Sequence, residues 1–246
     1  MRGRTAVVTG ASMGIGRGIA VALAAEGVRL AVVARRKELL EKLAAEIEGG
    51  QHARVGVIAQ DIMAPDAAAR IRDAALATLG HVDILVNCAG GSRPLPIDAG
   101  EERWEEAMTL NFTRQRQLTH AFLPGMIARK WGRIINVTGK SEPDRINAAF
   151  AAKAAVHSWA KGLSRDVGKF GITVNSIAPG RIISEQILRN YPEEERLRFS
   201  QEEIPVGEYG LPADLAVLAV FLASPLARYI TGTVIPVDGG LRRYQF

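Results

Sequence analysis

The sequence predicts an α/β fold in three layers, with a doubly wound parallel sheet of about seven strands between two layers of helices. Short apolar runs alternate with longer segments of helical periodicity along the whole chain. A parallel return between strands requires a crossover, usually a helix, so this alternation favours a sheet covered on both faces. No linker rich in Pro, Gly and Ser interrupts it. We therefore expect residues 1–246 to form one domain, because single α/β domains of roughly 250 residues are common.

Each predicted strand is a short apolar run bounded by charged or turn-forming residues. The seven runs are Thr5–Thr9, Arg29–Ala34, Arg54–Ala59, Asp83–Asn87, Arg133–Val137, Thr173–Ile177 and Val234–Val237. Between them, apolar residues recur at the spacing of one helix face. The predicted helices include Ile15–Ala25, Glu38–Ile47, Ala67–Leu79, Trp104–Ala128 and Ala148–Val167.

One segment breaks this alternation. Residues Ser184–Leu211 are rich in charge and carry Tyr191, Phe199 and Tyr209. They lie between the last two predicted strands, where a long insertion is typical of a loop that covers a substrate. The sequence therefore predicts a lid over residues 184–211.

The composition excludes several classes of protein. The longest wholly apolar run, Leu215–Ala223, is far shorter than the roughly 20 residues that span a bilayer, so no membrane segment is expected. The net charge is +5, but acidic and basic residues are interleaved, which argues against nucleic-acid binding. A single Cys88 and four His give no metal-ligand spacing, and no export signal is visible. We expect a cytoplasmic protein without a metal site.

A glycine-rich turn after the first strand predicts a dinucleotide site. Gly10, Gly14 and Gly16 have the spacing G-x-x-x-G-x-G and open a helix. Glycine permits a tight turn and close approach of the backbone to a pyrophosphate, and the N–H groups of a helix N-terminus favour an anion. A tight turn without a ligand is the alternative interpretation.

Two arginines favour NADP(H) as the cofactor. Arg35 and Arg36 follow the second strand, where an acidic residue would bind the ribose 2′-hydroxyl of NAD and an arginine suits a 2′-phosphate. NAD(H) is the second candidate. The alternative interpretation is that both arginines only begin a solvated helix.

Seven short motifs together resemble the short-chain dehydrogenase/reductase family, most closely the group that includes the 3-oxoacyl carrier-protein reductases. The resemblance covers essentially the whole chain. The motifs are Thr9-Gly10-x3-Gly14-x-Gly16, Asp61-Ile62, Asn87-Cys88-Ala89-Gly90, Leu110-Asn111-Phe112, Ala152-Lys153-Ala154-Ala155-Val156, Pro179-Gly180 and Val237-Asp238-Gly239-Gly240. Cys88 stands where a second Asn is usual.

The resemblance implies a Rossmann fold and an NADP(H)-dependent oxidoreductase that acts on a small carbonyl or alcohol substrate. Asp61 would bind the adenine, Asn87–Gly90 would wall the cofactor cleft, and Pro179–Ser184 would contact the nicotinamide amide. The full set of expected cofactor residues is Gly10, Ser12, Met13, Gly14, Ile15, Gly16, Arg35, Arg36, Asp61, Ile62, Asn87, Ala89, Gly90, Lys153, Pro179, Gly180, Ile182 and Ser184.

The catalytic pattern of the family is incomplete in this chain. The family uses Asn, Ser, Tyr and Lys, with Tyr and Lys at i and i+4 on one helix face. Asn111 and Lys153 are present, but Ala149 stands in the Tyr position and Gly139 in the Ser position. Phe150 is expected to point about 100° away around the helix. The connection from 139 to 149 is also short, so residues 140–145 have been rebuilt.

Three explanations remain open. In the first, Ser141 or Thr138 orients the substrate, and Lys140, Asp144 or Tyr191 supplies the proton. In the second, the protein binds the cofactor without redox chemistry, as a sensor or partner subunit. In the third, the hydride acceptor is so activated that it needs little acid from the protein.

The two retained catalytic residues each have a structural alternative. Lys153 is the only charge in Ala148–Val156, which favours a contact to the cofactor ribose, whereas a snorkelling surface lysine is the alternative. Asn111 would bend a helix and hold a water of the proton relay, or it is a buried polar residue bonded to backbone. We expect Ala149 to face the cleft. The family resemblance implies a homotetramer or homodimer, packed through the predicted helices at 104–128 and 148–168 and the C-terminal segment.

Overall fold

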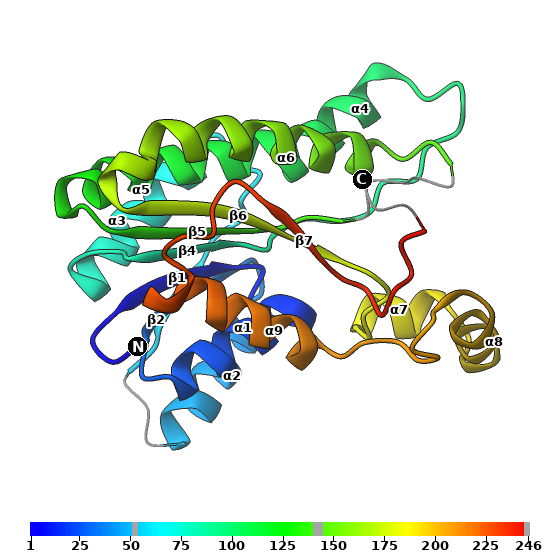
Figure 1. The fold of residues 1–246 in the computed structure, drawn as a ribbon, viewed down its shortest axis with the longest axis horizontal. Coiled ribbons are helices and arrows are strands. Elements are labelled where there is room, and N and C mark those ends of the chain that lie inside the picture. Colours follow the sequence, from blue (N-terminus) through cyan, green and yellow to red (C-terminus); the bar gives the residue numbers. More distant parts are fainter. Residues whose placement is uncertain (51–53, 140–144, 244–246) are drawn as a thin grey trace.

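The sheet has seven strands in the order β3-β2-β1-β4-β5-β6-β7, and all neighbours are parallel (Figure 1). The structure is a computed structural model, and it describes residues 1–50, 54–139 and 145–243. The strands are β1 Thr5–Thr9, β2 Arg29–Ala34, β3 Gly56–Ala59, β4 Ile84–Asn87, β5 Gly132–Val137, β6 Ile172–Pro179 and β7 Val234–Val237. The order runs outward from β1 in both directions, so the predicted doubly wound sheet is confirmed.

Helices cover both faces of the sheet, because each strand is apolar on both sides. One core contains the buried faces of α1 Gly14–Ala25, α2 Lys37–Gly49 and α9 Pro212–Ala223. The other contains those of α3 Ala67–Leu79, α5 Arg114–Arg129 and α6 Ala148–Val167. Ile135 and Ile177 face the first core, whereas Ile134 and Val174 face the second.

The predicted helix at 104–128 is wrong as a single α-helix. It divides into α4 Glu101–Met108, a π-helical turn η1 Thr109–Thr113, and α5. At this turn the Asn111 Nδ2 donates to the carbonyl oxygen of Ala107 at 3.0 Å. The side chain thereby satisfies a helix carbonyl where the regular bonding pattern changes, as is common at π-bulges.

The expected lid segment contains two helices, α7 Glu185–Asn190 and α8 Glu193–Glu203. In Figure 1 they lie beyond the carboxyl ends of the strands, on the side of α1 and α9, while α4 lies on the opposite side. The carboxyl edge of the sheet therefore lies between two peripheral elements. Short 3₁₀ turns at Gly168–Phe170 and Pro225–Ala227 complete the described fold. None of the described helices is long and apolar enough to cross a membrane.

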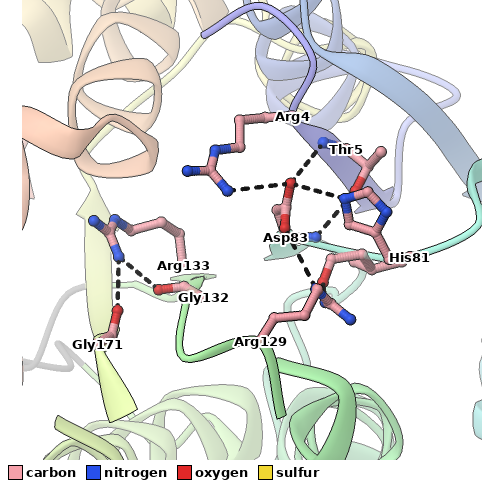
Figure 2. Close-up of polar contacts among 9 residues, drawn as sticks. Arg4, Thr5, His81, Asp83, Arg129, Gly132, Arg133 and Gly171 are labelled. Atoms are coloured by element: carbon pink, nitrogen blue, oxygen red, sulfur yellow. Dashed lines mark hydrogen bonds and ion pairs between the residues drawn. The ribbon is translucent and has the colours of Figure 1, made fainter. Parts of the chain in front are cut away.

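At the amino edge of the sheet, one buried carboxylate is surrounded by two arginines and a histidine (Figure 2). Asp83 is only 2% exposed, and its carboxylate accepts the N–H of Thr5 at 3.3 Å. It lies 3.7 Å from Arg4, 3.3 Å from His81 and 3.8 Å from Arg129. The cluster ties the start of β1 to the segment before β4 and to the end of α5.

A second buried charge lies beside it. The Arg133 guanidinium donates to the carbonyl oxygens of Gly132 at 2.8 Å and Gly171 at 3.1 Å (Figure 2), and to Ser224 at 3.3 Å. The Trp131 ring lies between the guanidinium groups of Arg4 and Arg133, at 3.8 and 4.4 Å. Burial, and secondarily Arg4, lowers the pKa of Arg133 to about 10. Arg133 is therefore still charged at neutral pH, with carbonyl oxygens as its acceptors.

Candidate active site

The glycine turn after β1 needs glycine for steric reasons. Gly10 has φ +67°, and a Cβ there would lie 3.0 Å from the backbone nitrogen of Ala89. A Cβ on Gly16 would lie 2.4 Å from the carbonyl oxygen of Gly10. The Thr9 hydroxyl accepts the N–H groups of Cys88 and Ala89 at 3.0 and 3.1 Å, which holds the segment after β4 against this turn. The tight turn and its close backbone contacts are thus confirmed.

The turn leads directly into α1. Met13 is the N-cap, and no side chain caps this helix end in the described part of the chain. Ser12, Met13, Gly14 and Ile15 are partly exposed and border the turn. The first-turn N–H groups are therefore available to an anionic ligand.

The segment after β2 brings positive charge to the same edge. Arg35 and Arg36 are exposed, and neither forms an ion pair with any of the described residues. Lys37, by contrast, pairs with Glu41 at 3.4 Å. The geometry thus leaves two guanidinium groups free at the place predicted for a 2′-phosphate.

The expected adenine and cleft-wall residues are placed as follows. Asp61 is exposed after β3, and its Oδ1 accepts the N–H of Met63 at 3.0 Å, while Ile62 is buried. Ala89 and Gly90 follow β4 and are at least partly exposed. Asn87 is fully buried, and its Nδ2 donates into the interior, so of this residue only the backbone can border the cleft.

Asn111 is fully buried and bonded to backbone on both sides of its amide. Its Oδ1 accepts the N–H of Gly91 at 3.0 Å, and its Nδ2 donates to Ala107. A Cβ on Gly90 would lie 2.9 Å from the same Oδ1. The side chain therefore connects the segment after β4 to the π-helical turn.

The ammonium of Lys153 lies beside Gly139, the residue that follows Thr138 at the end of β5. A Cβ on Gly139 would lie 3.2 Å from Lys153 Cδ and 3.6 Å from its Nζ. Lys153 makes no ion pair with a described residue, and burial lowers its pKa, with the nearby Cys88 opposing the shift. Burial raises the pKa of Cys88 to about 12, so its thiol is protonated at neutral pH. Lys153 is thus not a snorkelling surface residue.

The expectation that Ala149 faces the cleft is wrong, whereas Phe150 points away from Ala149 around the helix, as predicted. Ala149 is 0% exposed, in a buried stripe of α6 with Ala148, Ala152 and Val156, and so does not face an open cleft. Phe150 instead approaches the segment after β5, where its Cδ1 is 3.9 Å from the position that a Cβ on Gly139 would take. The helix thus turns residues 150 and 153, at i and i+3, toward the end of β5.

One polar pair at this site was not expected. His157, one turn beyond Lys153 on α6, has its Nε2 2.8 Å from the Thr138 hydroxyl. That hydroxyl donates to the carbonyl oxygen of Ile177 at 3.1 Å and is buried, so it is not free to orient a substrate. Burial lowers the pKa of His157, and Arg242 and Lys153 add to the effect. The sequence feature that could have predicted this pair is the i, i+4 spacing of Lys153 and His157, which places both on one face of the helix.

The loop after β6 closes the edge on the lid side. A Cβ on Gly180 would lie 2.6 Å from Asp238 Cα, so this backbone contact also needs glycine. Ile182 is buried, and Ser184 caps α7 by accepting the N–H of Ile187 at 3.3 Å. A Cβ on Gly14 would lie 3.4 Å from Ser184 Cβ. The start of the lid therefore contacts the glycine turn.

Two aromatic residues of the segment 184–211, Tyr191 and Phe199, lie over Arg181. Its guanidinium lies 5.3 Å from the ring of Tyr191 and 4.8 Å from that of Phe199, which meets Tyr209 edge to face at 6.1 Å. Burial, first among several effects, raises the pKa of Tyr209. Tyr191, a candidate proton donor, therefore packs on a cation of the loop after β6.

The remaining candidates, Lys140, Ser141 and Asp144, lie outside the described residues. Within the described residues, no three His, Cys, Asp or Glu side chains are grouped to hold a metal ion. The candidate site therefore comprises the glycine turn, Arg35, Arg36, Lys153 and the segments after β4, β5 and β6.

Comparison with known proteins decides the family. The profile of a family described as Enoyl-(Acyl carrier protein) reductase matches residues 10–242, nearly the whole chain. The chain belongs to the short-chain dehydrogenase/reductase family.

Curated members of this oxidoreductase family match over almost their full length. The 3-oxoacyl-[acyl-carrier-protein] reductase of Vibrio cholerae serotype O1 is 35% identical, with 98% of each chain covered. The galactitol 2-dehydrogenase (L-tagatose-forming) of Cereibacter sphaeroides is 34% identical, covering 97% of this chain and 94% of the relative. Among solved structures, L-sorbose reductase from Gluconobacter frateurii, complexed with NADPH and L-sorbose, has a TM-score of 0.93 at 29% identity. That match covers 99% of this chain and 98% of the sorbose reductase.

Membership of the short-chain dehydrogenase/reductase family leaves one feature of this chain to explain. Along β5 and α6, Gly139, Ala149 and Phe150 bring no hydroxyl group to Lys153. The glycine turn and the arginines after β2 match the sequence pattern described above, whereas no Tyr or Ser stands at positions 149 and 139.

Proposed function

We propose that the protein is an NADP(H)-dependent oxidoreductase acting on a small carbonyl or alcohol substrate through a non-standard active site. The observation that carries this proposal is the cofactor cradle. At Gly10 and Gly16 the backbone packs so closely against neighbouring backbone that a Cβ would clash. The start of α1, which no side chain caps, lies beside them. A dinucleotide pyrophosphate is the ligand that such a turn suits.

The residues around the cradle fit NADP(H). Arg35 and Arg36 would bind the 2′-phosphate, Asp61 and Ile62 the adenine, and Lys153 the nicotinamide ribose. Pro179, Gly180, Ile182 and Ser184 would border the nicotinamide amide. The sorbose reductase, which matches almost the whole chain, is complexed with NADPH. When bound, the nicotinamide supplies or accepts the hydride, and the protein supplies orientation and the proton.

The proton is assigned to the rebuilt segment after Gly139. Ser141 would orient the substrate oxygen and Lys140 would donate the proton, with Asn111 and Lys153 holding the surrounding structure and the ribose. Gly139, two residues beyond the end of β5, lies beside the Lys153 ammonium and is the last described residue before this segment. Tyr191 is the second candidate donor.

A cofactor-binding protein without redox chemistry is the second candidate function. It is favoured by one observation: the α6 side chains that face Gly139 are a phenyl ring and an ammonium. Such a protein would bind NADP(H) as a sensor or as a subunit of a larger assembly.

The two functions differ in turnover. Calorimetry should show tight binding of NADPH, and a screen of ketones, aldehydes and alcohols should find a substrate. Lys140→Ala and Ser141→Ala should then lower turnover by about 10²-fold, the usual effect of a positioned acid or base. Lys161→Ala, an exposed lysine of α6, is the matched control. Tight NADPH binding with no turnover on any substrate would establish the second function instead.

We also propose that the chain assembles as a homotetramer or homodimer. Helix α9 exposes Val217 at 71% and Phe221 at 39%, and Leu226 and Tyr229 just beyond it are 82% and 91% exposed. Large exposed apolar side chains close together in sequence favour an interface at this end of α9. Light scattering should give a mass of two or four chains, and Leu226→Ser with Tyr229→Ser should lower it.

A further inference from the structure

Helix α6 presents one row of side chains to the end of β5. Phe150, Lys153 and His157 follow one another at i, i+3 and i+7, the spacing of a single helix face. The side chains of Phe150 and Lys153 both come within 4 Å of the point where a Cβ on Gly139 would lie. His157 contacts Thr138. Both Phe150 and Lys153 are partly exposed. The row therefore borders the site with one apolar ring and one ammonium side by side.

Ala149 belongs to a different face of the same helix. It is fully buried, and its N–H donates to the Asn147 side chain at 2.9 Å, which fixes the first turn of α6. Asn147 in turn accepts the N–H of Arg93 at 3.2 Å, and its Nδ2 donates to Ser92 Oγ at 3.0 Å. The rotation of α6 is thus held by the segment after β4, and this rotation selects Phe150 as the residue that faces the site.

We propose that Phe150 is a specificity-determining residue that contacts the substrate through its ring, beside the Lys153 ammonium. The inference rests on the proposed function and deepens it by naming a substrate class. The substrate is a carbonyl compound or alcohol whose carbon framework next to the functional group is flat and apolar, as in an aryl or conjugated ketone. Aromatic side chains prefer such partners, because stacked or edge-to-face contacts add to the burial of apolar area.

The positions of these side chains also lead to a prediction that does not depend on a substrate. A hydroxyl added to the Phe150 ring would share its surroundings with the Lys153 ammonium, and a nearby positive charge stabilises a phenolate. The pKa of a tyrosine at 150 should therefore fall below the usual value of about 10. A tyrosine at 149 would enter the packed stripe and show no such decrease.

The first experiment is a spectrophotometric pH titration of Phe150→Tyr without cofactor, with the wild-type spectrum subtracted. We expect the added phenol to ionise at least one pH unit below a free tyrosine, and Phe150→Tyr with Lys153→Met to lose this decrease. A phenol that ionises near 10 or higher in the single variant would overturn the proposed geometry.

The second experiment measures binding of two probes, acetophenone and cyclohexyl methyl ketone, to the protein saturated with NADP⁺. Wild type should bind acetophenone more tightly, and Phe150→Ala should weaken that affinity about tenfold, while Phe150→Leu should reverse the preference. Equal acetophenone affinity in wild type and Phe150→Ala would overturn the role in specificity. Failure of wild type to bind NADP⁺ would reject the proposed function instead, and the phenol titration would still test the geometry.

Discussion

The two edges of the sheet differ in whether their charged side chains have partners within the protein. At the amino edge, Asp83 lies among two arginines and a histidine (Figure 2), and Arg133 donates to three carbonyl oxygens. At the carboxyl edge, the Lys153 ammonium has no carboxylate partner among the described residues, and Arg35 and Arg36 are equally free. The amino edge is therefore internally complete, whereas the carboxyl edge has charge available for a ligand.

Neutral polar groups without partners also lie toward the carboxyl edge. Asn87, Asn136 and Ser176 are neighbours across β4, β5 and β6, and all three are buried. Among the described residues, Asn87 Oδ1, Asn136 Nδ2, Ser176 Oγ and Gln115 Oε1 find no hydrogen-bond partner. Unpaired buried polar atoms cost stability, and these atoms lie toward the carboxyl ends of the strands. Doubly wound sheets bind their ligands at this edge.

Removing the centre of the amino-edge cluster should have the largest effect. Asp83→Ala would leave Arg4, His81 and Arg129 facing one another, and we expect the free energy of unfolding to fall by about 2–4 kcal/mol. Denaturant titration measures it, and the folded protein should bind NADPH as before. Glu41→Ala, which breaks the exposed pair with Lys37, should cost only a few tenths of a kcal/mol. Equal effects of the two variants would contradict the comparison.

At the carboxyl edge, loss of a free charge should affect binding and leave stability unchanged. Arg35→Ala should weaken NADPH binding tenfold to a hundredfold, about 1.5–3 kcal/mol, and leave NADH binding unchanged. Calorimetry with both cofactors measures the preference, and Lys37→Ala is the matched control. Equal affinities of the wild-type protein for NADPH and NADH would contradict the proposed contact between Arg35 and the 2′-phosphate.

The rotation of α6 can be tested through stability. Ala149→Tyr forces a ring into a fully buried stripe and should lower the free energy of unfolding by about 1–3 kcal/mol. Ala151→Tyr, at an exposed position of the same helix, should change it by less than about 0.5 kcal/mol. Denaturant midpoints of the two variants give the comparison. An Ala149→Tyr variant as stable as the wild-type protein would indicate that residue 149 faces the cleft.

The smallest effect concerns pH. The pKa of His157 is lowered in the folded protein, so the unfolded chain binds more protons as the pH falls below 6.5. Stability should therefore be complete above pH 6.5 and decrease as the pH falls toward the folded pKa. His157→Gln should reduce this loss by less than about 1 kcal/mol, measured from urea midpoints at pH 7.5 and 5.5. An unchanged pH dependence would contradict the burial of the imidazole.

Local patterns sufficed to predict the strands, the glycine turn and the free arginines. The apolar runs matched the observed strands within about two residues, because burial on both faces demands continuous apolar sequence. Gly10 and Gly16 could be assigned because their role depends on the turn itself. Arg35 and Arg36 could be placed because the end of β2 fixes them.

Three features depended on contacts that local patterns do not contain. The π-helical turn arises where Asn111 bonds Ala107 and the distant Gly91. The orientation of Phe150 depends on the Asn147 contacts that set the rotation of α6, which spacing from Lys153 alone could not predict. The Asp83 cluster joins residues from three separate parts of the chain.

The position of Trp131 has an optical consequence. Its indole ring lies between the guanidinium groups of Arg4 and Arg133, at the edge of the sheet opposite the site. The emission of an indole responds to adjacent charge, so separation of either guanidinium alters the fluorescence of this residue. Of the three tryptophans in the chain, Trp131 therefore serves as a built-in spectroscopic probe of loosening at the amino edge, without an added label.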